Sequence, residues 1–140
     1  MDFFSSRACI HMDNKTASQI LTKEFMTRRR NEHGERSFPI NALRCYDGFT
    51  VSVQASAFNY CWPRENNADM WVRWELGYPS AEVAELLPYA EDETRPMDTV
   101  YAQVPSEVVM SVLEAHGGLI MHDPVQELLL KSLEDQVDEI

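Results

Sequence analysis

The sequence has little of what common catalytic and phosphate-binding sites are built from. Its five glycines are dispersed and form no phosphate-cradling loop, and the motifs G-x-S-x-G and H-E-x-x-H are absent. The four histidines (His11, His33, His116 and His122) stand in separate contexts, so a metal site has no local support. We therefore expect a protein that is not an enzyme, with no catalytic residues, no metal site and no cofactor.

Cysteine is also scarce, and its number is odd. Cys9, Cys45 and Cys61 form no C-x-x-C pair, which predicts free thiols in a reducing compartment. Cys45 and Cys61 each lie next to a tyrosine in apolar surroundings, where a thiol is usually inert. The chain has no apolar run long enough to span a membrane, and residues 1–11 make a poor signal peptide. We expect a cytoplasmic protein without a membrane partner.

Positive charge is in deficit, with 12 Lys and Arg against 23 Asp and Glu and a net charge of −11. Phosphate repulsion would oppose binding along a nucleic-acid backbone, so we expect no long nucleic acid as partner. A mononucleotide-sized ligand is still compatible with this charge, because only the local charge of its pocket matters. The acidic stretches 91–98 and 134–139 favour an alternative, an inhibitor or nucleic-acid mimic that blocks a basic groove on a host protein.

A β-hairpin is the clearest fold signal. Residues 42–46 and 49–55 flank Asp47-Gly48, a dipeptide that tolerates positive φ at both centres of a type I′ turn. The second arm alternates between apolar and polar residues, so one face packs on a core and the other looks outward or into a cleft. We assign four residues to the polar face: Thr50, Ser52, Gln54 and Ser56.

A helix is predicted over residues 16–30, opened by the capping-box pattern Thr16-x-x-Gln19. Residues 28–30 at its end are all arginine. These cations either stabilise the negative end of the helix dipole or, as the only basic run of the chain, contact an anion.

Alternation predicts further strands over residues 70–78 and 99–104, and helical spacing predicts helices over 81–87 and 107–116. The sum is an α+β fold, a small antiparallel sheet built on the hairpin with three to four flanking helices. The first of these strands is expected to have two faces, one with Trp71, Arg73 and Glu75 and the other with Met70, Val72, Trp74, Leu76 and Tyr78.

The chain divides into three parts. Residues 1–12 are expected to form a loose N-terminal leader, and residues 13–122 a single α+β domain. Residues 123–140 are expected to form a C-terminal amphipathic helix whose leucine stripe packs on the same chain or on a second copy.

Arginine accounts for nine of the twelve basic residues, and several arginines are interleaved with tyrosine and tryptophan around the predicted sheet. A guanidinium can meet two phosphate oxygens, and an aromatic face can stack on a base. The opposing interpretation is that these arginines pair with carboxylates while the tryptophans belong to the core. The predicted ligand-binding residues are Arg44, Gln54, Ser56, Tyr60, Trp62, Arg64 and Arg73.

The segments DGF, SVQAS, YC-x-PR, GYPS and AHGG, spread over about residues 40 to 118, resemble a family of small, acidic phage-encoded proteins. The chain is similar in size and expected architecture to phage anti-defence proteins of the Thoeris anti-defence sponge type. The resemblance implies a homo-oligomer in the cytoplasm of the host bacterium that binds and sequesters a cyclic immune signal, either cyclic ADP-ribose-like or a cyclic oligonucleotide, without cleaving it. A phosphodiesterase acting on such nucleotides is the third hypothesis. No ligand contact is carried over from that group.

Overall fold

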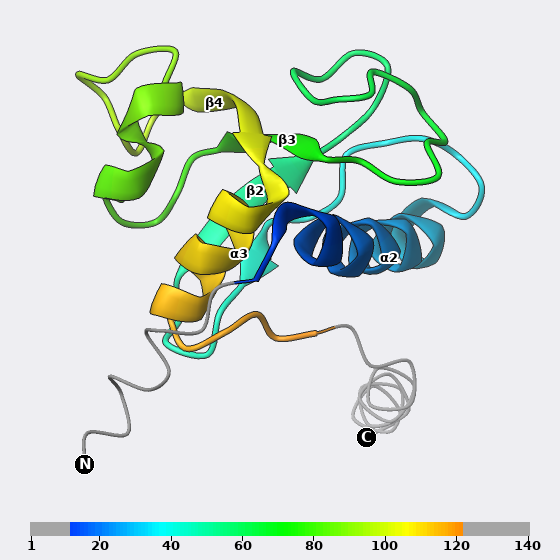
Figure 1. Ribbon diagram of the computed structural model, residues 1–140, viewed down its shortest axis with the longest axis horizontal. Coiled ribbons are helices and arrows are strands. Elements are labelled where there is room, and N and C mark those ends of the chain that lie inside the picture. Colours follow the sequence, from blue (N-terminus) through cyan, green and yellow to red (C-terminus); the bar gives the residue numbers. More distant parts are fainter. Residues whose placement is uncertain (1–11, 122–140) are drawn as a thin grey trace, which may run out of the picture.

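The structure of the protein, a computed structural model, describes residues 12–121 (Figure 1). The expected C-terminal helix over 123–140 lies outside the described residues, as does the expected leader except for Met12. The elements in chain order are helix α2 (Asn14–His33), strands β1 (Leu43–Arg44), β2 (Thr50–Gln54) and β3 (Arg73–Gly77), the 3₁₀ helix η1 (Ala84–Tyr89), strand β4 (Val100–Pro105) and helix α3 (Ser106–Ala115).

The strands form one antiparallel sheet in the order β1-β2-β3-β4. Within the described residues, two α-helices and one 3₁₀ helix accompany this sheet. The two α-helices meet at their N-terminal ends, where the backbone N–H of Glu107 donates to the side-chain oxygen of Asn14 at 3.1 Å (Figure 1). The α+β class is therefore confirmed.

The hairpin is present, but its turn differs from the expected one. Arg44 lies opposite Thr50, as the hairpin requires. Positive φ in the turn is confined to Gly48, at 95°, so the turn is not type I′. The Asp47 carboxylate accepts a hydrogen bond from the backbone N–H of Phe49 at 2.8 Å. This local side-chain contact stabilises a longer turn in which a left-handed glycine alone is sufficient.

The predicted apolar face of β2 is confirmed, since Val51 and Val53 are buried. Beneath it, the Phe25 ring of α2 lies edge-on to the rings of Trp71 and Trp74, with centroids 5.3 and 5.5 Å away. The Trp74 ring N–H donates to the Ser106 hydroxyl oxygen at 2.8 Å. The core therefore joins the sheet to both α-helices.

The sequence predicts that Trp71 shares a face of the strand with Arg73 and Glu75. The structure shows that it does not. It is fully buried, and its backbone N–H donates to the Thr22 hydroxyl at 3.0 Å. Strand β3 begins only at Arg73, so the alternation that would have turned Trp71 outward does not apply to it.

The helices differ from the expected ones mainly at their ends. α2 is longer than predicted, and its N-cap is Asp13, whose carboxylate accepts from the Thr16 N–H at 2.7 Å, in place of the capping box. α3 lies within one residue of its predicted range. In place of the helix expected over 81–87, the chain forms the 3₁₀ helix η1 (Ala84–Tyr89), which includes Pro88.

Candidate ligand-binding surface

The segment that follows β2 carries exposed aromatic rings. Tyr60 is 48% exposed and Trp62 is 57% exposed. The Arg64 guanidinium lies over the Tyr60 ring, 5.5 Å from its centroid, a cation–π arrangement. The backbone of Trp62 pairs with Arg73 in an antiparallel bridge, so these two side chains leave the backbone on the same side. We call Tyr60, Trp62, Arg64 and Arg73 the ring-guanidinium surface.

Both arginines of the ring-guanidinium surface are exposed. Among residues 12–121, neither guanidinium has a hydrogen-bond or ion-pair partner. The interpretation that these arginines pair with carboxylates therefore does not hold for Arg64 and Arg73. Two unpaired cations beside two exposed rings suit a flat anionic ligand.

Two polar side chains hold this surface on the sheet, and the sequence did not point to either. The Glu75 carboxylate accepts from the Asn59 side-chain amide at 2.9 Å and from the Tyr60 backbone N–H at 3.1 Å. Gln103 donates from its side-chain amide to the Cys61 carbonyl at 3.0 Å and from its backbone N–H to the Tyr60 carbonyl at 2.9 Å. The backbone under the rings is thus bonded to β3 and β4.

Gln103 has a left-handed backbone, with φ at 55°, near the point where the register of β3 and β4 shifts. Such a conformation is uncommon for a residue other than glycine and occurs often near functional sites. Here it allows one residue to use both its backbone and its side chain to hold the segment that carries Tyr60.

Two of the predicted site residues are used inside the fold. The Gln54 amide donates to the Ile40 carbonyl at 2.7 Å and accepts from the Ile40 N–H at 2.9 Å, and the side chain is buried. The expectation that Gln54 faces solvent or a cleft is therefore wrong, because the chain at Ile40 covers this part of the polar face. The Ser56 hydroxyl donates to the Asn59 side-chain oxygen at 2.6 Å.

Arg44 lies apart from the other candidates. It faces Thr50 at the start of β2, whereas Gln54 at the far end of β2 faces Glu75. Four residues of strand separate the two ends, about 13 Å. The structure therefore brings Tyr60, Trp62, Arg64 and Arg73 together and leaves Arg44 outside.

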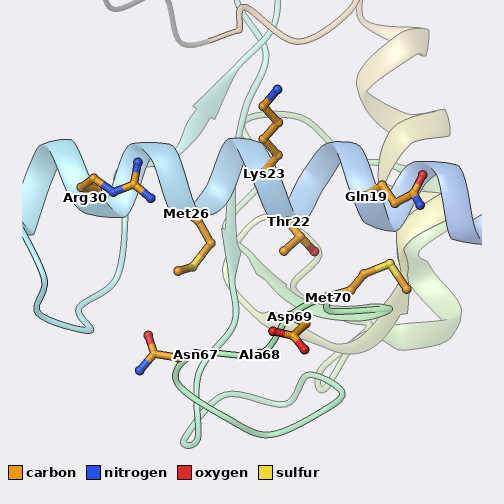
Figure 2. A pocket seen from close by; sticks show the side chains of 9 residues that line it. All are labelled: Gln19, Thr22, Lys23, Met26, Arg30, Asn67, Ala68, Asp69 and Met70. Atoms are coloured by element: carbon orange, nitrogen blue, oxygen red, sulfur yellow. The ribbon is translucent and has the colours of Figure 1, made fainter.

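A hollow in the described part of the chain lies elsewhere. It is an open groove of about 600 Å³ between α2 and residues 67–70 (Figure 2). The basic run at the end of the predicted helix was the only sequence signal near it, through Arg30. Its lining residues are Gln19, Thr22, Lys23, Met26, Arg30, Asn67, Ala68, Asp69 and Met70.

The titratable groups next to the sheet are structural. Burial raises the pKa of the Cys45 thiol to about 11 and also raises the pKa of the Cys61 thiol, so both stay protonated and unreactive at neutral pH. The Asp47 carboxylate lies 2.7 Å from the His116 ring nitrogen. The hydrogen bond from the Phe49 N–H, followed by that from His116, lowers the pKa of Asp47. This pair ties the hairpin turn to the end of α3.

No group of three or more His, Cys, Asp or Glu side chains that could hold a metal ion was found among residues 12–121. No helix in that range is long and apolar enough to cross a membrane. Comparisons with protein-family models, with curated proteins and with solved structures gave no match.

Proposed function

We propose that this protein is a phage anti-defence protein that binds a small cyclic nucleotide on its ring-guanidinium surface and sequesters it without cleaving it. One observation carries the proposal. Two exposed rings lie beside two guanidinium groups that have no hydrogen-bond or ion-pair partner among residues 12–121, on residues 60–64 and on Arg73, which pairs with Trp62. The chain that carries them has a net charge of −11. Two such arginines beside two exposed rings suit a small anion even in so acidic a protein.

The chemistry of each group gives it a role. The Trp62 ring stacks on a base, an interaction of about 1–3 kcal/mol. Arg73, which faces Trp62 across the bridge, binds phosphate oxygens, and bidentate contacts make arginine suited to this task. Arg64, which already lies over the Tyr60 ring, binds a second phosphate without first being ordered.

The surface is open on one chain, and a sequestering protein needs to enclose its ligand. A second copy of the chain would supply the missing walls, and we therefore propose a homo-oligomer with a shared site. The proposed ligand is a cyclic ADP-ribose-like molecule or a cyclic oligonucleotide, and the proposed location is the cytoplasm of the host bacterium.

The proposal is tested by retention and release of ligand. The protein is incubated with cyclic ADP-ribose or with a cyclic dinucleotide, freed of excess ligand and heated, and the released material is identified by mass spectrometry. Intact ligand is expected from the wild type and from Arg36→Ala. Arg36 is the matched control, because it also lies over an exposed ring, that of Phe38, at 5.6 Å. Arg64→Ala and Arg73→Ala are expected to retain no ligand while keeping the melting temperature of the empty protein.

Three outcomes would contradict the proposal. A fragmented ligand would indicate a phosphodiesterase, and no ligand from the wild type would remove the nucleotide as partner. Equal retention by Arg64→Ala and Arg36→Ala would place binding outside the ring-guanidinium surface.

The exposed acidic loop between η1 and β4 favours a second candidate function. Glu91, Asp92, Glu93 and Asp98 are all exposed, in a segment that also contains Arg95, which pairs with Asp98. Such a surface would suit an inhibitor that occupies a basic groove on a host protein. The complex would weaken steeply with salt and would be insensitive to Arg64→Ala, which separates this function from nucleotide binding.

A further inference from the structure

The groove between α2 and residues 67–70 has walls that the fold holds in place. At one end, Arg29 is buried and donates to the Asn66 carbonyl at 2.5 Å and to the Asn67 side-chain oxygen at 2.6 Å. At the other end, Thr22 accepts from the Trp71 N–H at 3.0 Å. The loop is thus bonded to α2 at both ends of the groove, so the hollow exists before any ligand binds.

The helix wall of the groove carries two exposed cations. Lys23 and Arg30 both line the groove and are both exposed. Among the described residues neither has a hydrogen-bond or ion-pair partner. They are seven residues apart on α2, two turns or about 10 Å along its axis. Lys23 and Arg30 can therefore each contact a different phosphate group of one small molecule.

The remaining lining residues indicate that the ligand has an apolar body and a hydrogen-bond donor in addition to its charged groups. Figure 2 shows Thr22 and Met26 pointing from α2 toward the facing loop, which carries Asp69 and Met70. Methionine side chains adapt to flat or irregular apolar groups. Asp69 accepts hydrogen bonds from hydroxyl or amino groups and repels phosphate, so it sets the direction in which a ligand lies.

The charge around the groove contrasts with the rest of the molecule. Lys23 and Arg30 share the lining with one carboxylate, Asp69, and the buried Arg29 guanidinium donates to the side-chain oxygen of Asn67. No carboxylate partner of Arg29 is found in the range 12–121. The groove is therefore locally positive in a chain whose net charge is −11. Of the three arginines that end the predicted helix, Arg30 is the one without a hydrogen-bond or ion-pair partner among residues 12–121.

We propose that this groove is a second ligand site, separate from the ring-guanidinium surface, which binds a small phosphorylated molecule with a flat or apolar body. The phosphates contact Lys23 and Arg30, the body lies against Met26 and Met70, and a hydroxyl or amino group donates to Asp69. The volume of about 600 Å³ is sufficient for a ligand of nucleotide size.

The test uses the full chain with Arg64→Ala and Arg73→Ala as background, so that failure of the proposed function does not affect the result. The probes are adenosine 3′,5′-bisphosphate, adenosine and inorganic pyrophosphate, followed by calorimetry and by backbone amide NMR. The bisphosphate is expected to bind at least about tenfold more tightly than either fragment and to shift the amide signals of residues 67–70.

Charge reversal identifies the contacts. Lys23→Glu with Arg30→Glu is expected to weaken bisphosphate binding by about tenfold or more. The matched control is Arg36→Glu with Arg44→Glu, which changes the net charge equally at exposed arginines outside the groove and is expected to change affinity by no more than about twofold. Thermal unfolding of each variant checks that the fold is kept.

The inference is overturned if both charge-reversal pairs lose affinity equally, because the effect would then be that of overall charge. It is also overturned if none of the probes binds, if pyrophosphate binds as tightly as the bisphosphate, or if the shifted amides lie away from residues 67–70.

Discussion

Two groups of aromatic residues lie close in sequence and have opposite surroundings. Trp71 and Trp74 are fully buried against Phe25 of α2. Tyr60 and Trp62 are about half exposed. On sequence alone the two groups form one series of rings interleaved with arginines. The comparison shows that the residue type does not decide the role of a ring, whereas the element packed above it does.

The cause lies in what each ring contacts. Trp74 points to the face that α2 and α3 cover, and its N–H has a buried partner in Ser106. Trp62 lies opposite Arg73 at the beginning of β3 and stays exposed to solvent. Rings of the first group stabilise the fold, and rings of the second group are free for a ligand.

The largest expected effect comes from truncating one ring of each group. Trp74→Ala should lower the free energy of unfolding by about 3–5 kcal/mol, because it removes a fully buried ring and the hydrogen bond that this ring donates to the Ser106 hydroxyl. Trp62→Ala should change it by no more than about 0.5 kcal/mol. Urea unfolding measures both, and equal losses would contradict the division into a core group and a surface group.

The hairpin and its buried face could be predicted because they depend on local signals, the Asp47-Gly48 turn and the period of two in β2. Trp71 was misplaced because its orientation depends on where β3 begins, which the pairing of Trp62 with Arg73 helps to define. That pairing joins segments that no sequence pattern connects.

The candidate site was predicted in part for the same reason. The exposure of Trp62 agrees with the local pattern. Gln54, however, is covered by Ile40, which is remote in sequence. The roles of Glu75 and Gln103 become visible only when the segment around Tyr60 is placed on the sheet. The groove beside α2 could not be predicted at all, because its two walls are about forty residues apart in sequence.

A second comparison concerns two neighbouring arginines of α2. Arg29→Met should lower the free energy of unfolding by about 2–3 kcal/mol, since it leaves the Asn66 carbonyl and the Asn67 side chain without their buried donor. Arg30 follows Arg29 in the sequence and is exposed. Arg30→Met should therefore lower the free energy of unfolding by no more than about 0.5 kcal/mol. Thermal or urea unfolding distinguishes them, and a large effect at Arg30 would show that it is structural and not free for a ligand.

Gln54→Leu tests whether this side chain belongs to the fold. The change keeps the approximate volume but leaves the N–H and carbonyl of Ile40 unpaired, at a cost of about 1–3 kcal/mol. The Ile40 amide should then exchange its hydrogen faster than in the wild type. Unchanged stability and exchange would restore Gln54 as a candidate ligand contact.

The smallest effect is expected from the Asp47 carboxylate, whose pKa in the folded protein is lowered by its hydrogen bonds to Phe49 and His116. A lowered pKa means that the carboxylate adds stability above its ordinary pKa and loses it as the pH falls through the folded value. Asp47→Asn should therefore lower the melting temperature at pH 6 and approach the wild type at pH 2. A difference that grows on acidification would contradict this assignment.

Tryptophan fluorescence tests the central claim most directly, because Trp62 is the exposed tryptophan and Trp71 and Trp74 are buried. We predict that the nucleotide retained by the wild type quenches its emission on titration, and that the quench disappears in Trp62→Phe, which keeps a ring for stacking and the two buried tryptophans. An equal quench in both proteins, or a retained nucleotide that leaves the emission of the wild type unchanged, would show that the ligand does not stack on Trp62.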